Sequence, residues 1–205
     1  MRASRATDNG EKTSGGSDQP AVNPKDIGKA LLVLEAQRGD ERAFEQLVAS
    51  YTEALRYYVR GLLKTNDEVD DVLQETWLAA FRQLKRLRSA RAFAPWLYRI
   101  ARNRALRRLR KPKHLVPMTD EIEAAATEST DWEPSADDAK LVNACLTELP
   151  PHHREILTLR YVGEMTYEQL AETLECRVGT VRSRLFNAKQ ALRRRIEKQT
   201  GEPSK

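Results

Sequence analysis

Apolar positions recur every three and four residues along most of this chain, which is the spacing of an amphipathic helix. The first such stretch, IGKALLVLEAQRG, starts at Ile27, and the second follows Asp40, a residue type that often caps helices. In NDEVDDVLQETWLAAFRQLKRL the apolar stripe is formed by Val69, Val72, Leu73, Trp77, Ala80, Phe81 and Leu84. No segment alternates apolar and polar residues as a strand does, so the pattern predicts an all-α protein.

The helical pattern is interrupted, which predicts two small domains. Residues 1–26 are rich in Gly, Ser, Asp, Asn and Pro and have no apolar period, so we expect a disordered tail. Residues 27–112 and 138–198 carry the two helical blocks, and 199–205 form a second tail. Between the blocks, residues 113–137 read as a flexible acidic linker.

Charge is distributed unevenly along the 205 residues, and this distribution is more informative about a binding partner than the net charge of +5. Between Glu75 and Asp120 there is no acidic residue, whereas from Asp120 to Asp138 there is no Lys or Arg. A long one-sided basic stretch repels itself unless an anionic partner lies against it. The distribution therefore points to a polyanion such as nucleic acid.

Several other classes of protein are disfavoured. The apolar runs are too short to cross a bilayer, so we expect a cytoplasmic protein. Cys145 and Cys176 lack metal-ligand spacing, so we expect no metal and no cofactor; packing is the expected role for both thiols, with oxidation sensing as the alternative. His114, His152 and His153 have no nucleophile motif or phosphate loop with them, so we expect no enzyme.

The segment MTYEQLAETLECRVGTVRSRL has the pattern of a helix-turn-helix. Thr166 and Gln169 form a capping box, residues 175–177 make the turn, and Val181 and Leu185 turn the next helix's apolar face inward. The side chains left to point outward are Arg182, Ser183, Arg184 and Lys189. The second helix of such a motif lies in the DNA major groove, where arginine can bond guanine through two atoms.

Two questions stay open in this half of the chain. A basic helix that merely faces solvent is the alternative for the end of the second helix, where Arg193, Arg194, Arg195 and Lys198 contact either phosphate or water. His152 and His153 either start the helix after LPP or contact phosphate.

The run CRVGTVRSRLFNAKQAL, preceded by LPPHHREILTLRYVGEMTYEQLAETL, resembles region 4 of bacterial RNA polymerase sigma factors of the extracytoplasmic-function (ECF) group. The resemblance implies that this helix-turn-helix binds the −35 promoter element. The residues implied to do so are Thr180, Arg182, Ser183, Arg184 and Lys189. Arg177 stands where the family often has Pro, and Asn187 where it often has Arg, so the preferred DNA sequence could differ.

The helix that contains DVLQE resembles sigma region 2, whose D-x-x-Q-E helix docks on the clamp helices of the largest polymerase subunit. By position, the resemblance implies polymerase contacts by Asp71, Gln74 and Glu75. The spacing places these three and Leu78 on a face apart from the apolar stripe. Trp77 and Phe81, on the stripe, are expected in the core.

The segment SARAFAPWLYRIARNRALRRLRK predicts a further helix, with Pro95 in its first turn and a basic side that includes Arg110. Such a side could hold the phosphates of opened DNA while the preceding loop receives a flipped base. The resemblance implies that this is the −10 site, with the base selected between Arg88 and Phe93. The implied contacts are Arg88, Arg91, Phe93, Arg99, Arg102, Asn103 and Arg107.

Two positions in this segment need a comment. Arg107 stands where relatives often have Asp, which puts its part in base selection in doubt. Core packing is favoured over base stacking for Trp96.

Taken together, the resemblance implies a sigma factor that binds core RNA polymerase and promoter DNA, melts promoters and directs transcription initiation at a specific regulon. It also implies an anti-sigma factor as partner and no small-molecule substrate. A free-standing transcription factor that uses only the helix-turn-helix is the first rival, but it leaves the face of Asp71, Gln74 and Glu75 unexplained. An enzyme is the second.

Overall fold

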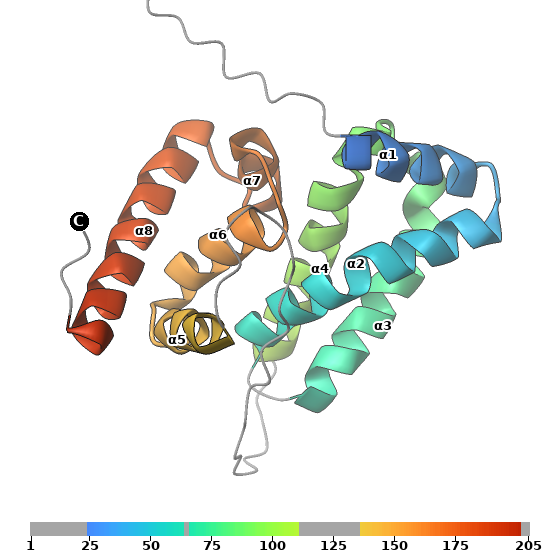
Figure 1. The fold of residues 1–205 in the computed structure, drawn as a ribbon. Coiled ribbons are helices and arrows are strands. Elements are labelled where there is room, and N and C mark those ends of the chain that lie inside the picture. Colours follow the sequence, from blue (N-terminus) through green and yellow to red (C-terminus); the bar gives the residue numbers. More distant parts are fainter. Residues whose placement is uncertain (1–23, 64–65, 111–135, 202–205) are drawn as a thin grey trace, which may run out of the picture.

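The computed structural model describes residues 24–63, 66–110 and 136–201, and within these ranges every regular element is helical. The N-terminal domain consists of α1 (Pro24–Gln37), α2 (Glu41–Leu62), α3 (Asn66–Gln83), the 3₁₀ turns η1 (Leu84–Arg86) and η2 (Ala90–Ala92), and α4 (Phe93–Arg110). The C-terminal domain consists of α5 (Ala136–Thr147), α6 (Pro151–Tyr161), α7 (Tyr167–Thr173) and α8 (Val178–Thr200). Figure 1 shows these two groups of helices side by side. The predicted all-α fold with two helical domains is confirmed.

The helix starts follow from local chemistry. Asp40 caps α2, as predicted: its Oδ1 accepts hydrogen bonds from the backbone N–H groups of Arg42 at 2.9 Å and Ala43 at 3.2 Å. The α1 helix begins at Pro24, slightly before the predicted Ile27, and α5 begins at Ala136, just inside the stretch predicted as linker. Most of that linker, and most of both predicted tails, lie outside the described residues.

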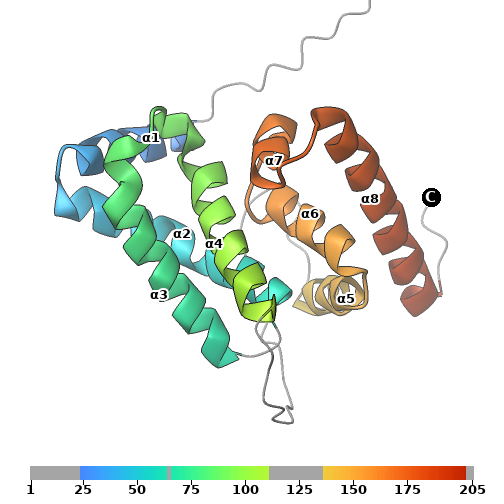
Figure 2. The ribbon, with the colours of Figure 1, turned by 180° about the vertical axis from the view of Figure 1, so that it is seen from behind.

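The apolar stripe of α3 packs against α2 and α4, and α3 and α4 lie at the front in the reversed view of Figure 2. The buried members of the stripe are Val69, Val72, Leu73, Ala80 and Leu84. Trp77 is half-buried, with its ring edge-on to Phe44 at 6.1 Å between centroids. Phe81 is 58% exposed, so its predicted core position is wrong. It lies near the end of α3, where its ring is 5.2 Å from that of Phe44 between centroids.

The connection from α3 to α4 is held by one amide. Gln37 Nε2 donates to the carbonyl oxygens of Leu84 at 3.0 Å and Leu87 at 2.7 Å. The Leu84 carbonyl oxygen also accepts the backbone N–H of Leu87 at 3.0 Å within η1, so the half-buried amide adds a contact that ties this turn and Leu87 to α1. This contact fixes the start of the segment that carries Arg88 and Arg91.

The helix-turn-helix forms as predicted. In the capping box of α7, Gln169 N–H donates to Thr166 Oγ1 at 3.3 Å, and Thr166 N–H donates to Gln169 Oε1 at 2.9 Å. Glu175, with φ of 53°, turns the chain into α8, whose inner face buries Val181 and Leu185. Gly163 makes the tight turn before α7, because a Cβ there would lie 2.7 Å from the Leu159 carbonyl oxygen.

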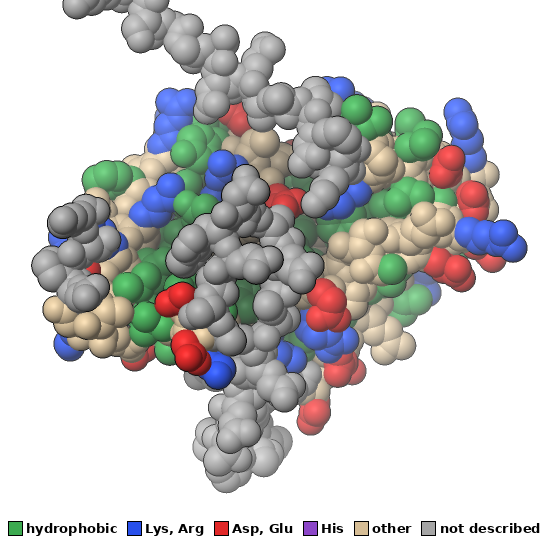
Figure 3. Space-filling model, in the orientation of Figure 1, with side chains coloured by type: hydrophobic (Ala, Val, Ile, Leu, Met, Phe, Trp, Pro, Cys, Tyr) green, Lys and Arg blue, Asp and Glu red, His purple; other side chains and the backbone are tan. Residues whose placement is uncertain are grey.

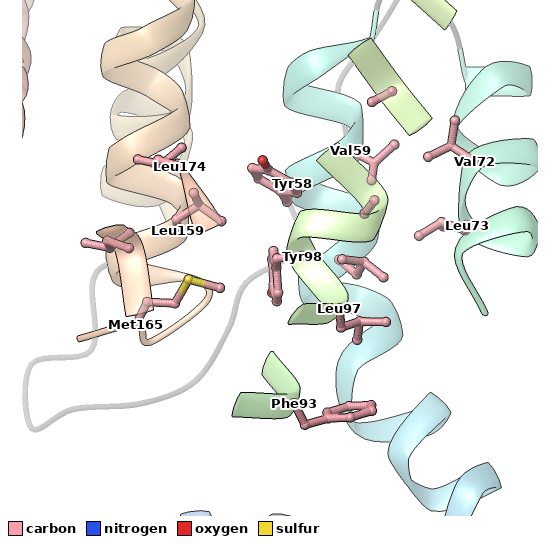
Figure 4. Close-up of a cluster of buried hydrophobic side chains, with 14 of the residues drawn as sticks. Tyr58, Val59, Val72, Leu73, Phe93, Leu97, Tyr98, Leu159, Met165 and Leu174 are labelled. Carbon is pink, nitrogen blue, oxygen red and sulfur yellow. The ribbon is translucent and has the colours of Figure 1, made fainter. Parts of the chain in front are cut away.

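The two domains pack directly on each other. Helix α6 contacts α2, and α7 contacts α4, so one hydrophobic cluster runs through both domains. Figure 4 shows Tyr58 and Tyr98 on the N-terminal side facing Leu159, Met165 and Leu174 on the other. The sequence predicted two separate domains on a tether and did not predict this contact.

In the space-filling view, acidic and basic side chains are mixed over the visible, described part of the surface, with apolar side chains among them (Figure 3). Among the helices described, none is long and apolar enough to cross a membrane.

Candidate functional sites

The outward side of α3, opposite its apolar stripe, carries the residues implied to contact polymerase. Asp71 and Gln74 are exposed, and Leu78 is 49% exposed although it is apolar. Single exposed apolar residues are common on protein surfaces, so the interest of Leu78 comes from its place beside Asp71 and Gln74. We call Asp71, Gln74, Glu75 and Leu78 the outer face of α3. Its predicted separation from the core is confirmed.

Glu75 differs from its neighbours because two arginines of α4 hold its carboxylate. Arg108 donates through Nη2 to Glu75 Oε1 and Arg104 through Nη1 to Glu75 Oε2, both at 2.8 Å. Arg108 also donates through Nη1 to Asp71 Oδ2 at 2.9 Å. These hydrogen bonds, chiefly that from Arg108, lower the pKa of the Glu75 carboxyl despite an opposing effect of burial.

Arg104 and Arg108 were missed by the reading of the sequence. Asp71 and Glu75 are four residues apart on α3, and Arg104 and Arg108 are four residues apart on α4. Matching spacings of opposite charge are a usable signal once two helices are known to pack together, because residues at this spacing share a helix face. The order of the helices in the chain does not establish that packing.

The basic side of α4 is only partly open to a ligand. Asn103 and Arg107 are exposed and, together with Leu106 and Arg110, line a shallow hollow. Arg99 is half-buried on the same helix. The hollow therefore unites two of the predicted −10 contacts and adds Arg110, already placed on the basic side.

Arg102, predicted on the same basic side, turns instead toward the C-terminal domain. Its Nε donates to Glu155 Oε1 of α6 at 2.8 Å, and only 22% of the Arg102 side chain is exposed. Burial acts to lower the pKa of the guanidinium, but the hydrogen bond and charge of Glu155 outweigh it, so the pKa is raised. In this conformation Arg102 is engaged within the protein.

Phe93 is not part of an accessible loop. Its side chain is 1% exposed, because Phe93 starts α4 and its ring packs against Tyr51 at 5.4 Å and Trp96 at 5.9 Å between centroids. Phe93 is therefore not accessible to a base in this conformation, and its part in base selection stays a prediction. Arg88 and Arg91, on the same connection, are exposed. Trp96 is half-buried on Phe93, in keeping with the favoured packing role.

The start of α8 presents polar side chains outward, as the pattern predicted. Arg182, Ser183, Arg184 and Lys189 are exposed, and Thr180 is half-buried in the first turn. The guanidinium of Arg182 lies 6.0 Å from the ring centroid of Tyr167 at the start of α7. This cation–π contact connects the two helices of the motif and restricts where the arginine points.

Phe186 is a further candidate that the sequence reasoning missed. It is 62% exposed, and it follows Arg182 by four residues and precedes Lys189 by three, so the three share one helix face. An apolar ring on a face that lies in the major groove can contact the methyl group of thymine. The signal was available, because Phe186 is the apolar residue that falls off the Val181 and Leu185 stripe.

The two histidines of α6 and Cys145 lie in helices and contact neighbouring side chains. His152 and His153 occupy the first turn of α6, as one of the two interpretations expected. Burial lowers the pKa of His153, and the charge of the neighbouring His152 lowers it further. Cys145 is buried, and its Sγ lies 3.2 Å from Gln199 Oε1. Among the described residues, no three His, Cys, Asp or Glu side chains gather as a metal site would require.

Comparison with known protein families agrees with this division into two domains. The family model described as Sigma-70 region 2 matches residues 47–114, and the model described as Sigma-70, region 4 matches residues 139–192. The first match contains the outer face of α3 and all of α4. The second contains the helix-turn-helix.

Curated relatives match over nearly their whole length. The ECF RNA polymerase sigma-E factor of Escherichia coli is 34% identical over 179 residues, which are 82% of this chain and 93% of that protein. The RNA polymerase sigma-H factor of Pseudomonas aeruginosa is 33% identical over 184 residues, 81% of this chain and 92% of that protein.

Solved structures show a similar fold. CnrH, in complex with the cytosolic domain of CnrY, matches with a TM-score of 0.58 at 27% identity, over 80% of this chain and 94% of CnrH. The sigma factor RpoE of Bartonella quintana, in complex with the anti-sigma factor NepR, matches with a TM-score of 0.58 at 23% identity, over 75% of this chain and 96% of that one. The chain thus belongs to the ECF group of the sigma-70 family and is an RNA polymerase sigma factor of transcription initiation.

Proposed function

We propose that this sigma factor divides its work among three surfaces: the outer face of α3 binds core polymerase, α8 reads the −35 duplex, and α4 holds the opened −10 strand. The observation that carries the proposal is the helix-turn-helix with Arg182, Phe186 and Lys189 on one exposed face. Such a face offers a donor for guanine and an apolar group for thymine.

Binding of core polymerase is assigned to α3 because its outer face combines Asp71, Gln74 and exposed Leu78. Interfaces of this kind join an apolar contact to charged groups that orient the partner. The clamp helices of the largest polymerase subunit are the proposed partner, as the resemblance to sigma region 2 implies.

The −10 strand is assigned to the hollow of Asn103, Arg107 and Arg110, together with Arg99 and Arg102 earlier on α4 and Arg88 and Arg91 on the connection before it. Arginines bind phosphates without reading the base, so they explain grip on the strand rather than sequence preference. Arg88 and Arg91 replace Phe93 as the side chains of the α3–α4 connection that can reach a base.

We further propose that the protein acts in the cytoplasm, performs no catalysis of its own, and is controlled by an anti-sigma factor. Two similar structures were solved with CnrY and NepR bound, which supports a partner of this kind.

A run-off transcription assay tests the function directly. Core polymerase with and without this protein is incubated with a fragmented genomic library from the source organism. Discrete new transcripts whose upstream sequences share two elements are the expected result. DNA binding without polymerase and without transcripts would instead support the free-standing regulator.

A further inference from the structure

We propose that the docked arrangement of the two domains and the capture of opened DNA compete for one side chain, Arg102. This inference rests on the proposed function, in which the basic side of α4 holds the −10 strand. Glu155 of the C-terminal domain accepts a hydrogen bond from Nε of Arg102 in the docked state. The strand can therefore use Arg102 only after α6 has moved away from it.

The polar centre of the contact between the domains is a single carboxylate oxygen. Glu155 Oε1 accepts hydrogen bonds from Arg102 Nε at 2.8 Å and from the Tyr58 hydroxyl at 3.0 Å. Only 13% of the Glu155 side chain is exposed, and Tyr58 is 1% exposed. Burial raises the pKa of Tyr58 well above its ordinary value, with the Glu155 charge adding to the effect, so its hydroxyl stays a donor.

A carboxylate and a DNA phosphate present the same kind of ligand to arginine. Each is an anion with oxygen acceptors, and arginine forms charge-assisted hydrogen bonds with either. Glu155 is a partly buried anion that already accepts a hydrogen bond from Arg102. It therefore weakens the attraction of the same guanidinium for a phosphate. The Arg102 side chain is only 22% exposed while Glu155 is in place, so a phosphate has little access to its other N–H groups.

Two further hydrogen bonds between the domains involve residues that are not predicted to bind DNA. The Tyr57 hydroxyl, next to Tyr58 near the C-terminal end of α2, donates to Asn143 Oδ1 of α5 at 2.7 Å. Thr173 Oγ1 of α7 lies 3.4 Å from the Pro95 carbonyl oxygen of α4. These contacts, with the apolar side chains in Figure 4, hold the domains together around the Glu155 centre.

Docking engages Arg102 of the −10 surface and leaves the −35 surface free. Arg182 and Lys189 on α8 remain exposed, as do Asn103 and Arg107 on α4. The docked protein should therefore keep its duplex-reading face while its grip on a single strand is incomplete. Apparent strand affinity is then reduced by the fraction of molecules that are docked.

The test uses the full chain without polymerase and two readouts. Binding of a fluorescein-labelled single-stranded oligonucleotide of mixed sequence is followed by anisotropy at low ionic strength. The radius of gyration is measured by small-angle X-ray scattering. Glu155→Gln keeps the side-chain shape and removes its charge, and we expect strand binding to tighten about fivefold while the particle expands.

Two further variants separate docking from charge. Tyr57→Phe removes a hydroxyl that contacts the other domain without altering charge or Arg102, so it should act in the same direction as Glu155→Gln. Glu172→Gln makes the same change of charge at an exposed position of α7 and should leave both readouts unchanged. Adding Arg102→Ala to Glu155→Gln should cancel the gain in strand binding.

The proposal is wrong if Glu155→Gln binds the strand no more tightly than Glu172→Gln, or if Tyr57→Phe expands the particle without changing strand affinity. A gain that persists in the double variant would also overturn it, since Arg102 would then not be the shared group. Failure here is distinct from failure of the proposed function. Run-off transcripts made by the unaltered protein would show that promoters are recognised whichever result the docking variants give.

Discussion

Arg108 Nη2 lies 2.8 Å from Glu75 Oε1, so the C-terminal part of α4 is joined to the outer face of α3. The same guanidinium reaches Asp71, and Arg104 takes the second oxygen of Glu75. The helix proposed to hold DNA is therefore tied to the face proposed to bind polymerase. Both carboxylates face the partner already oriented, which reduces the entropy lost on binding.

Gln74 gives a cleaner test of the polymerase contact than Glu75. Glu75→Lys would set a third cation beside Arg104 and Arg108 and so disturb the packing of α3 on α4. Gln74 is exposed, and Gln74→Lys should weaken binding to core polymerase by about tenfold or more because it adds a positive charge to the interface. The affinity is measured with labelled full-length protein.

The matched control is Gln46→Lys, at an exposed position of α2, which should bind polymerase as the unaltered chain does. Both variants should keep their binding to −35 duplex. Equal affinity of the Gln74→Lys and Gln46→Lys variants for polymerase would remove α3 from the interface.

The Glu75 pair should also appear in the pH dependence of stability. The pKa of Glu75 is lowered from its ordinary value of 4.5 in the folded protein. Folding is therefore favoured by this group above that value, and the contribution is lost as the pH falls through the lowered pKa. Glu75→Gln should reduce the free energy of unfolding at neutral pH by about 0.5 kcal/mol, a small figure because the carboxylate is 45% exposed.

Urea unfolding of the two proteins across a series of pH values checks this. The difference in unfolding free energy should shrink under acidic conditions, where both side chains are neutral. A difference that stays constant with pH would mean that the ion pair adds nothing and that the substitution acts through packing.

Arg182 and Arg194 should differ in what they contribute on DNA. Arg182→Ala should change the preference at one −35 base pair by about 1 to 3 kcal/mol, because arginine bonds two acceptors of guanine. Arg194, exposed late in α8, should contribute only a phosphate contact. Arg194→Ala should then weaken all sequences alike and reduce the salt dependence.

A library of −35 duplexes measured at several salt concentrations distinguishes the two. Uniform weakening of every sequence by Arg182→Ala would reassign that residue to the phosphate backbone.

Phe186 can be tested by removing a single methyl group from the DNA. Replacing a −35 thymine by uracil takes away the methyl and leaves base pairing intact. The unaltered protein should lose about 0.8 kcal/mol of binding free energy at the contacted base, the value of one buried methyl-sized group. Phe186→Ala should bind both duplexes equally.

The two changes form a double-mutant cycle, and the coupling between them is the measured quantity. If uracil weakens the Phe186→Ala variant as much as the unaltered chain at every thymine, Phe186 does not contact the methyl group. The −35 element would then be recognised through arginine contacts alone.

Much of the architecture could be predicted because the helix period and the caps are local properties. Asp40 and Thr166 mark helix starts through hydrogen bonds within a few residues, and the Val181 and Leu185 stripe shows which side of α8 is buried. The positions that were predicted wrongly depend on neighbours far along the chain. Phe81 lies on the apolar stripe of α3 but is 58% exposed. Phe93 starts α4, and its ring is buried against that of Tyr51.

Arg102 shows the same limit for the candidate site. Periodicity placed Arg102 on the basic side of α4. It could not show that Glu155, 53 residues later in the chain, accepts a hydrogen bond from that side chain. Arg104 and Arg108 were missed for the same reason. Side-chain chemistry can be read from local sequence, whereas the partner of a charged group is set by how helices pack.

The sharing of Arg102 also limits how this protein can diverge. A heritable change at that position, selected because it suits a new promoter, alters the contact with Glu155 in the same step. Lineages that replace Arg102 should therefore carry a compensating change at position 155, or inherit a chain whose two halves rest farther apart.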